Sequence, residues 1–414
     1  MLAAAVLSLA LTATVPGVAG AGGLTFDQAL GLVEQVPGVE GARAAVTAQR
    51  DMAGRISSQI ANPELRVEPG YRVSDSPTSA TRFEGTASLS QSWSLSGLGG
   101  RRREAARLEG DQLEAEARAI ALARRLSAAQ AWIDLWAAEA ALHEAREELE
   151  LAADLAVRSE RAAEHALLTR AESADAVAYR AEARLLALSI EGETTDLGYR
   201  LAREMARPPA ALSAIGALPD PALPDEREWP KLVERAAAAP EIVARRIAAH
   251  AEAARVAEVR AARGTQLTTG LALQRDNLGE YVVFGQVGIT LPIFDRGERE
   301  AAPYAAAAAR ARGEAEDAAR GAAAELARAF HEVEHTQEVL AEMEKGFVPA
   351  SAEAARLREV AFRAGDATVL EVLVARRGAA AARARLNRAR AAHAWAKVKI
   401  WLELAELARY GGPV

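Results

Sequence analysis

The amino-acid sequence contains the same plan twice, and this duplication restricts the fold more than any other feature does. Each copy starts with a short helical segment that is broken at a proline, Pro37 in the first copy and Pro240 in the second. A segment of alternating apolar and polar residues, a short turn-rich exit and a long helical stretch follow in the same order both times. Because a repeated plan predicts a repeated structure, we expect two similar halves built from the same elements.

The alternating segments predict one β-hairpin in each copy. Apolar and polar residues alternate along 63–95 and again along 265–291, which is the period of a strand with one apolar and one polar face. Turn-forming residues separate the two strands of each hairpin, at 74–80 and at 275–280. The strands are about ten residues long, which is the length of a tilted strand that crosses a bilayer.

The helical stretches have the apolar spacing of coiled coils. The sequence predicts helices over 101–163 and 170–207 in the first copy, and over 298–361 and 367–409 in the second. At a rise of 1.5 Å per residue, the longer helix of each copy measures about 95 Å. This is close to the summed length of two other helices of the same copy, the shorter coiled-coil helix and the opening helix that follows the proline. The lengths therefore favour a wall in which continuous helices lie beside stacked pairs.

The chain divides into four parts. Residues 1–21 are predicted to be a signal peptide, because an apolar run ends in small residues that fit a cleavage site, although a buried N-terminal helix is the alternative. The first repeat covers 22–207, a linker covers 208–228, and the second repeat covers 229–410. No later segment reaches the roughly 18 consecutive apolar residues of a membrane-spanning helix. If this chain spans a membrane, it does so with strands.

Four strands with one apolar face cannot cross lipid alone, because the two edge strands would leave peptide groups unpaired in hydrocarbon. Three chains together supply about 12 strands, an even number within the range of outer-membrane barrels. We therefore expect a mainly α fold with a small β part. In this fold a trimer forms a 12-stranded outer-membrane β-barrel, which continues into an α-helical coiled-coil barrel.

Composition excludes several functional classes. The 414 residues are 50% hydrophobic and 26% charged, so the chain can bury a core. The net charge of -7 gives no long-range attraction for nucleic acid. The absence of cysteine excludes disulfides, thiolate metal sites and a cysteine nucleophile. We expect no nucleic-acid partner, no cofactor and no enzyme activity.

With these features the sequence resembles the TolC family of outer-membrane efflux proteins. The resemblance rests on 287–295 with Gly297, which is similar to the family's strand-to-helix exit, and on 362–377, which is similar to its tunnel-tip segment. It implies a homotrimer in contact with outer-membrane lipid, with a periplasmic extension. It also implies two partners, a periplasmic adaptor (membrane fusion protein) and an inner-membrane RND-type pump. The implied function is the passive exit duct of a tripartite efflux system.

The exit of the first hairpin, 89–102, is similar to that of channels serving cobalt-zinc-cadmium and copper-silver pumps. This similarity favours metal cations as the exported solute. Drug efflux and type I protein secretion remain open, as does a periplasmic coiled-coil adaptor or scaffold. The duplicated hairpins favour the channel over the adaptor, because an adaptor does not need four strands of bilayer length.

Four acidic residues are candidates for the channel constriction. The resemblance implies that Glu371 lies at the tip, where three copies would form an acidic ring that selects cations. Asp366, Glu172 and Asp175 are further candidates at the helix breaks. Asp366 is alternatively a helix N-cap, like Thr169 in the other copy. Glu172 and Asp175 are alternatively first-turn charges that the helix dipole favours.

Two further groups of residues fit known patterns. Tyr71, Phe83, Trp93 and Tyr281 lie in the predicted strands, and we expect them to form an aromatic girdle at the lipid interface. The segment 331–335 matches H-E-x-x-H, a zinc-binding pattern, which leaves a zinc hydrolase as an alternative. Because the match falls within a long predicted helix that offers no cleft, we expect no metal site and no catalytic residue.

Overall fold

The computed structural model describes residues 22–56, 62–71, 83–276 and 279–410. The predicted signal peptide and the predicted turn of the first hairpin, 74–80, lie outside the described residues. Helices make up most of the described chain and strands a small part, which confirms the predicted mainly α class.

Two compact units divide the chain. The first unit contains Leu126–Pro221 and Val333–Val398 together with the chain up to Val33. The second contains Glu34–Arg125, Ala222–Glu332 and the chain from Lys399. Each unit draws on both halves of the sequence, so the units do not coincide with the predicted repeats.

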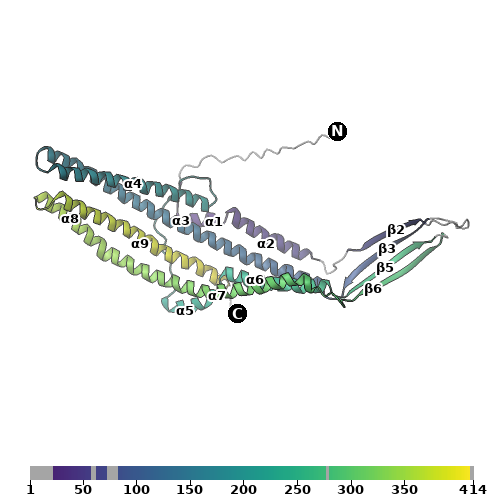
Figure 1. The fold of residues 1–414 in the computed structure, drawn as a ribbon. Helices are drawn as coiled ribbons and strands as arrows, with labels where there is room; N and C mark the ends of the chain where they lie inside the picture. Colours follow the sequence, from purple (N-terminus) through teal and green to yellow (C-terminus); the bar gives the residue numbers. More distant parts are fainter. Residues whose placement is uncertain (1–21, 57–61, 72–82, 277–278, 411–414) are drawn as a thin grey trace, which may run out of the picture. The chain divides into compact units, whose positions relative to one another are not determined.

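Apart from the short strands β1 and β4 and a break between α7 and α8, the elements follow the same order in both halves of the chain (Figure 1). Those of the first half are β1 (Gly23–Leu24), α1 (Phe26–Val33), α2 (Pro37–Arg55), β2 (Glu64–Tyr71), β3 (Phe83–Ser94), α3 (Leu98–Glu164), α4 (Arg170–Glu204) and β4 (Ser213–Ala214). Those of the second half are α5 (Trp229–Glu234), α6 (Pro240–Ala262), β5 (Gln266–Arg275), β6 (Tyr281–Thr290), α7 (Glu298–Glu342), α8 (Val348–Ala364) and α9 (Val369–Tyr410).

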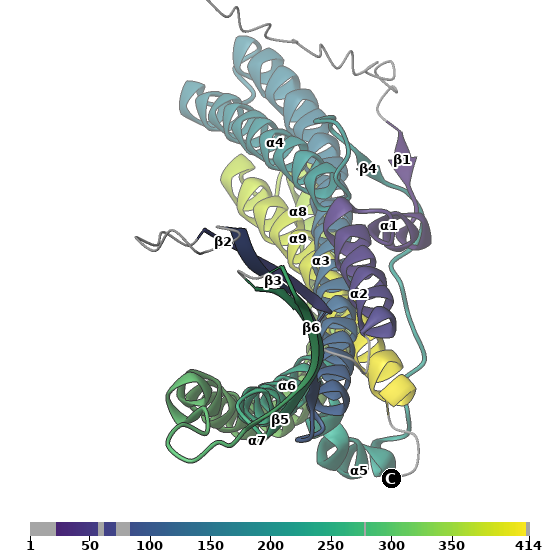
Figure 2. The same ribbon diagram turned by 90° about the vertical axis from the view of Figure 1, so that its right-hand side faces the viewer.

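Both opening helix pairs break where the sequence predicts. Pro37 and Pro240 each stand at the first position of a helix, where the missing N–H has no intrahelical partner to lose. The residue before each proline is extended, with ψ of 132° at Val36 and 141° at Ala239. In the first unit, the short parallel strands β1 and β4 pair beside α1 (Figure 2).

The four longer strands form one antiparallel sheet in the order β2-β3-β5-β6 (Figure 1). Residues paired in register share a face of the sheet. Val67, Ala87, Leu273 and Val283 form one such row. The face on which they lie, called the apolar face below, also carries exposed large side chains at Leu65, Leu89, Leu271, Val287 and Ile289. The opposite, polar face carries alternate residues such as Ser88, Ser90 and Thr268.

The helix predicted over 298–361 is interrupted, contrary to expectation. Between α7 and α8 the chain makes a π-helical turn at Met343–Phe347. Pro349 follows directly, in the first turn of α8. A proline inside a helix removes one N–H donor and clashes with the carbonyl group four residues earlier, and a π turn relieves both problems. Among the described residues, no helix has both the length and the apolar character needed to cross a membrane.

Candidate functional site

The first unit contains two helical hairpins, and the turns at their ends have the same conformation. The first tip (residues 165–169) joins α3 to α4, and the second tip (residues 365–368) joins α8 to α9. Ala166 and Gly365 have positive φ angles of 59° and 84°. The next residue of each tip donates its N–H back to the ending helix at 2.8 Å, Leu167 to Ala162 and Asp366 to Ala361. These are the hydrogen bonds of a helix that ends in a left-handed residue.

Each tip then starts its second helix with a capping box. The hydroxyl oxygen of Thr169 accepts the N–H of Glu172 at 3.2 Å, and the Glu172 carboxylate accepts the N–H of Thr169 at 2.9 Å. Thr368 and Glu371 repeat this exchange at 3.3 and 2.8 Å. Thr169 is the predicted cap. The alternative prediction of Asp366 as a cap is wrong, because Thr368 supplies the capping oxygen.

Glu371 is the predicted constriction residue, and its carboxylate has local partners. The N–H of Thr368 holds the pKa of Glu371 below its ordinary value, and the Thr368 hydroxyl and the charge of Arg358 act in the same direction. Arg358 Nη1 lies 3.0 Å from a Glu371 oxygen. The side chain is therefore charged at neutral pH, and it is exposed at the tip.

Of the other three acidic candidates, Asp366 lies in the second tip, and Glu172 and Asp175 lie in the first turns of α4, next to the first tip. The N–H of Thr169 lowers the pKa of Glu172, as in the second tip. Asp175 lies exposed one turn further along α4, and Asp366 is exposed within the second tip. The first unit therefore brings all four predicted acidic residues to the ends of its hairpins. Whether they line a constriction depends on other copies of the chain, so that role stays a prediction.

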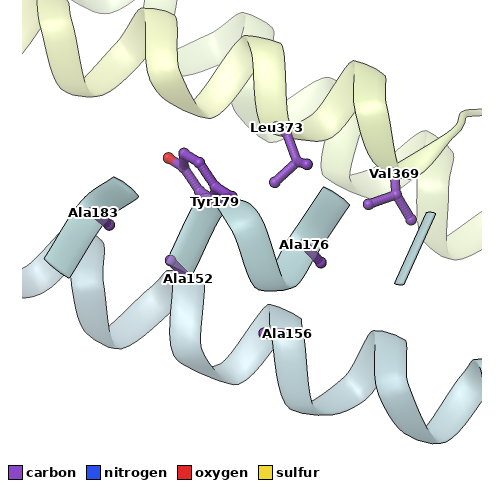
Figure 3. Packing of buried hydrophobic residues seen from close by; sticks show 7 residues of the cluster. All are labelled: Ala152, Ala156, Ala176, Tyr179, Ala183, Val369 and Leu373. Carbon is purple, nitrogen blue, oxygen red and sulfur yellow. The ribbon is translucent and has the colours of Figure 1, made fainter. Parts of the chain in front are cut away.

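A small hydrophobic cluster packs the two hairpins together below the tips. Figure 3 shows Tyr179 of α4 beside Leu373 of α9, with the alanines of α3 below them. The cluster comprises Ala152, Ala156, Ala176, Tyr179, Ala183, Val369 and Leu373. Alanines allow the helix backbones to approach closely, and Tyr179 fills the space that they leave.

A polar network that sequence reasoning missed lies at the edge of this cluster. The Tyr179 hydroxyl donates to Glu148 at 2.6 Å, and Arg383 Nη2 of α9 lies 3.5 Å from the same carboxylate. Burial, and then the hydrogen bond to Glu148, raise the pKa of Tyr179 well above its ordinary value. Arg377 stacks on the Tyr179 ring at 5.1 Å and pairs with Glu182. The signal in the sequence that could have indicated this network is Tyr179, a single tyrosine on a helix face otherwise made of alanines such as Ala176 and Ala183.

A polar cavity of about 160 Å³ lies between the hairpins beside this cluster. Arg363 and Arg376 both pair with Glu359 at its wall. Ser159 Oγ and Arg376 Nη1 are buried there without a hydrogen-bond partner among the described residues. Such a site has the polarity and the room to hold water.

All four predicted interface aromatics lie in the sheet on its apolar face. Tyr71 pairs with Phe83 at one end, and Tyr281 stands next to that end, opposite Arg275. Trp93 lies at the other end, in register with Leu267. All four are exposed. Their placement at the two ends of an apolar band fits an aromatic girdle, and lipid contact itself stays a prediction.

His331 and His335 lie one turn apart in α7. Within the described part of the chain, no group of three His, Cys, Asp or Glu side chains is arranged to hold a metal ion.

The chain matches solved structures of outer-membrane proteins. The chain matches the outer-membrane channel OprN with a TM-score of 0.75 and 19% identity, over 92% of this chain and 89% of that chain. It matches the outer-membrane protein VceC of Vibrio cholerae with a TM-score of 0.69 and 21% identity, over 94% of this chain and 96% of that chain. It also matches CusC, a protein described as forming a transmembrane channel, with a TM-score of 0.68 and 17% identity, over 92% of this chain and 91% of that chain. No protein-family model and no curated protein matches the sequence.

The chain therefore has the fold of an outer-membrane channel. The resemblance to the TolC family that the sequence indicates is confirmed as a shared fold. At these identities the likeness establishes the fold alone, and function follows from the residues of this chain.

Proposed function

We propose that the chain forms the outer-membrane exit duct of a tripartite efflux system and carries solutes passively. The observation that carries this proposal is a four-stranded sheet with one exposed apolar face, whose edge strands β2 and β6 have no partner on their outer sides among the described residues. In hydrocarbon every backbone N–H and C=O group needs a partner, so the sheet must close. Because all three pairings are antiparallel, β6 of one copy can pair with β2 of the next and keep the alternation.

Three copies closed in this way give a barrel of about 12 strands, within the range of known outer-membrane barrels. The apolar face then meets lipid and the polar face lines the duct. Hydroxyl groups dominate the β3 part of that lining, and Ser92 bonds to Thr268 across the strands at 3.0 Å. The helical hairpins would extend into the periplasm and end at the two tips, where an adaptor and an inner-membrane pump of the RND type would engage.

We further propose that Glu371 lines the constriction and that metal cations are the exported solute. Three copies of an exposed, charged carboxylate around an axis would attract cations and repel anions. Glu172, Asp175 and Asp366 would add negative charge near the same end. Because the fold does not depend on the solute, the exported solute has to be identified by a transport measurement.

Expression in a Gram-negative host followed by membrane fractionation tests the duct. We expect a trimer that mild detergent extracts from the outer membrane. Val287→Lys places a charge on the apolar face, which costs about 2–4 kcal/mol near the bilayer midplane, and it should abolish assembly. Gln286→Lys, one residue away on the polar face, is the matched control and should assemble. A soluble periplasmic monomer would contradict the proposal and favour the scaffold.

Conductance in planar bilayers tests the constriction. Glu371→Gln should lower the ratio of cation to anion permeability of the trimer. Glu353→Gln, which removes an exposed glutamate of α8 that pairs with Arg356, is the control and should leave the ratio unchanged. Equal ratios in wild type and Glu371→Gln would show that another residue sets the constriction.

A further inference from the structure

The apolar face of the sheet contains a notch. A cavity of about 200 Å³ opens near the end of the sheet at which Tyr71 and Phe83 pair. Its floor is Gly85 and Ala87, two small neighbours on the same face of β3. Val67 and Pro69 of β2 flank the floor on one side, and Leu273 and Arg275 of β5 on the other. Phe83 and Tyr281 complete the aromatic part of the wall.

Among the described residues that line this notch, the only cationic group is Arg275, the last residue of β5. Its guanidinium lies 5.8 Å from the centre of the Tyr281 ring. Its Nε atom is buried and has no hydrogen-bond partner among the described residues. A buried N–H without a partner is costly, and the cost is greater next to hydrocarbon than next to water. Among the described residues, Glu68 also lines the notch, and Asp276, which follows Arg275, accepts the N–H of Glu280.

We propose that this notch binds one lipopolysaccharide molecule, with an acyl chain on Gly85 and Ala87 and a lipid phosphate on Arg275. The inference rests on the proposed duct, which puts this end of the sheet, away from the helices, in the outer leaflet. An acyl chain fits a floor without large side chains between aliphatic and aromatic walls. A phosphate oxygen supplies the charge-assisted acceptor that Nε lacks, and Arg is well suited to bind phosphate.

Lipid retention tests the site. Wild-type trimer and variants are extracted in mild detergent and washed, and the lipopolysaccharide bound per trimer is measured by mass spectrometry. Arg275→Gln removes the cation and Ala87→Trp fills the notch. Arg275→Gln should lower retention about tenfold, the loss expected from one charge-assisted contact, and Ala87→Trp should also lower it because the acyl chain no longer fits. The matched controls are Arg66→Gln, on the polar face, and Leu271→Trp, on the apolar face outside the notch, and both should retain the lipid.

The outcomes separate this site from the duct itself. Trimers that assemble in the outer membrane but lose lipopolysaccharide only in the two notch variants support the site. Equal retention in all variants, or a glycerophospholipid in place of lipopolysaccharide, overturns the site and leaves the duct standing. If Ala87→Trp fails to assemble, Arg275→Gln alone decides. A wild-type protein outside the outer membrane overturns both proposals.

Discussion

The two tips have the same backbone and different side chains. The left-handed residue is Gly365 in the second tip and Ala166 in the first, although alanine is unfavourable in that conformation. Both tips make the same return hydrogen bonds and the same capping box. The duplicated turn therefore depends on the hydrogen bonds at its two sides rather than on glycine.

The hairpins differ more below the tips. Ten residues after its capping threonine, α4 has Tyr179, which is buried in the shared cluster. Ten residues after its own cap, α9 has Gly378, which faces open space. The first hairpin thus supplies the large side chain of the contact between the two. The second supplies aliphatic side chains, with Arg377 and Arg383 beside them.

The largest expected effect comes from removing that bulk. Tyr179→Ala should destabilise the hairpin pair by about 3–5 kcal/mol, because it leaves a cavity and takes a hydrogen-bond donor from the buried Glu148. Tyr179→Phe keeps the ring and should cost about 1–3 kcal/mol. Hydrogen exchange of tip peptides in the intact protein measures both. If Tyr179→Ala exchanges like the wild type, the cluster does not hold the hairpins together.

Local patterns predicted much of this fold. The alternating segments became strands, the prolines began helices, and the helix breaks fell close to their predicted places, at 165–169 and 365–368. The π turn was missed because Pro349 was read as part of a continuous helix. The alternative prediction of a cap at Asp366 overlooks Thr368, which with a glutamate three residues later carries the sequence signature of a capping box.

Contacts between distant segments could not be predicted in this way. Tyr179 and Glu148 are 31 residues apart, and Arg383 is 235 residues from Glu148. Nothing in the local sequence of any of the three indicates the others. The notch on the apolar face also depends on the register of three strands, which periodicity alone does not fix.

The next largest effect tests whether the two capping boxes are equivalent. Thr169→Ala and Thr368→Ala should each cost about 1 kcal/mol, the usual contribution of a cap. We expect equal losses, measured as faster amide exchange in the first turns of α4 and α9. Serine at either position keeps the hydroxyl and serves as the control. A clearly larger loss at one tip would mean that only that box supports its helix.

Exchanging the left-handed residues gives effects of opposite sign. Ala166→Gly should stabilise the first tip by about 1 kcal/mol, because glycine adopts this conformation without the steric cost that alanine has. Gly365→Ala should destabilise the second tip by a similar amount, since the φ of 84° remains while space is available for the new methyl group. Thermal unfolding and tip exchange would report both. Destabilisation by Ala166→Gly would show that the first tip does not bear this strain.

Acidification should have the smallest effect and should distinguish the tips least. The folded-state pKa values of Glu172 and Glu371 are both below the ordinary value of 4.5. Their stabilisation is therefore fully present above pH 4.5, and it is lost as the pH falls through the lower folded values. Amide-exchange protection of the tips, corrected for intrinsic exchange, should decline only in this acidic range.

Glu172→Gln and Glu371→Gln should each flatten the decline at one tip. Arg358 also favours the charged form of Glu371, so the decline at the second tip should extend to the lower pH. The opposite order would mean that Arg358 does not pair with Glu371 in solution.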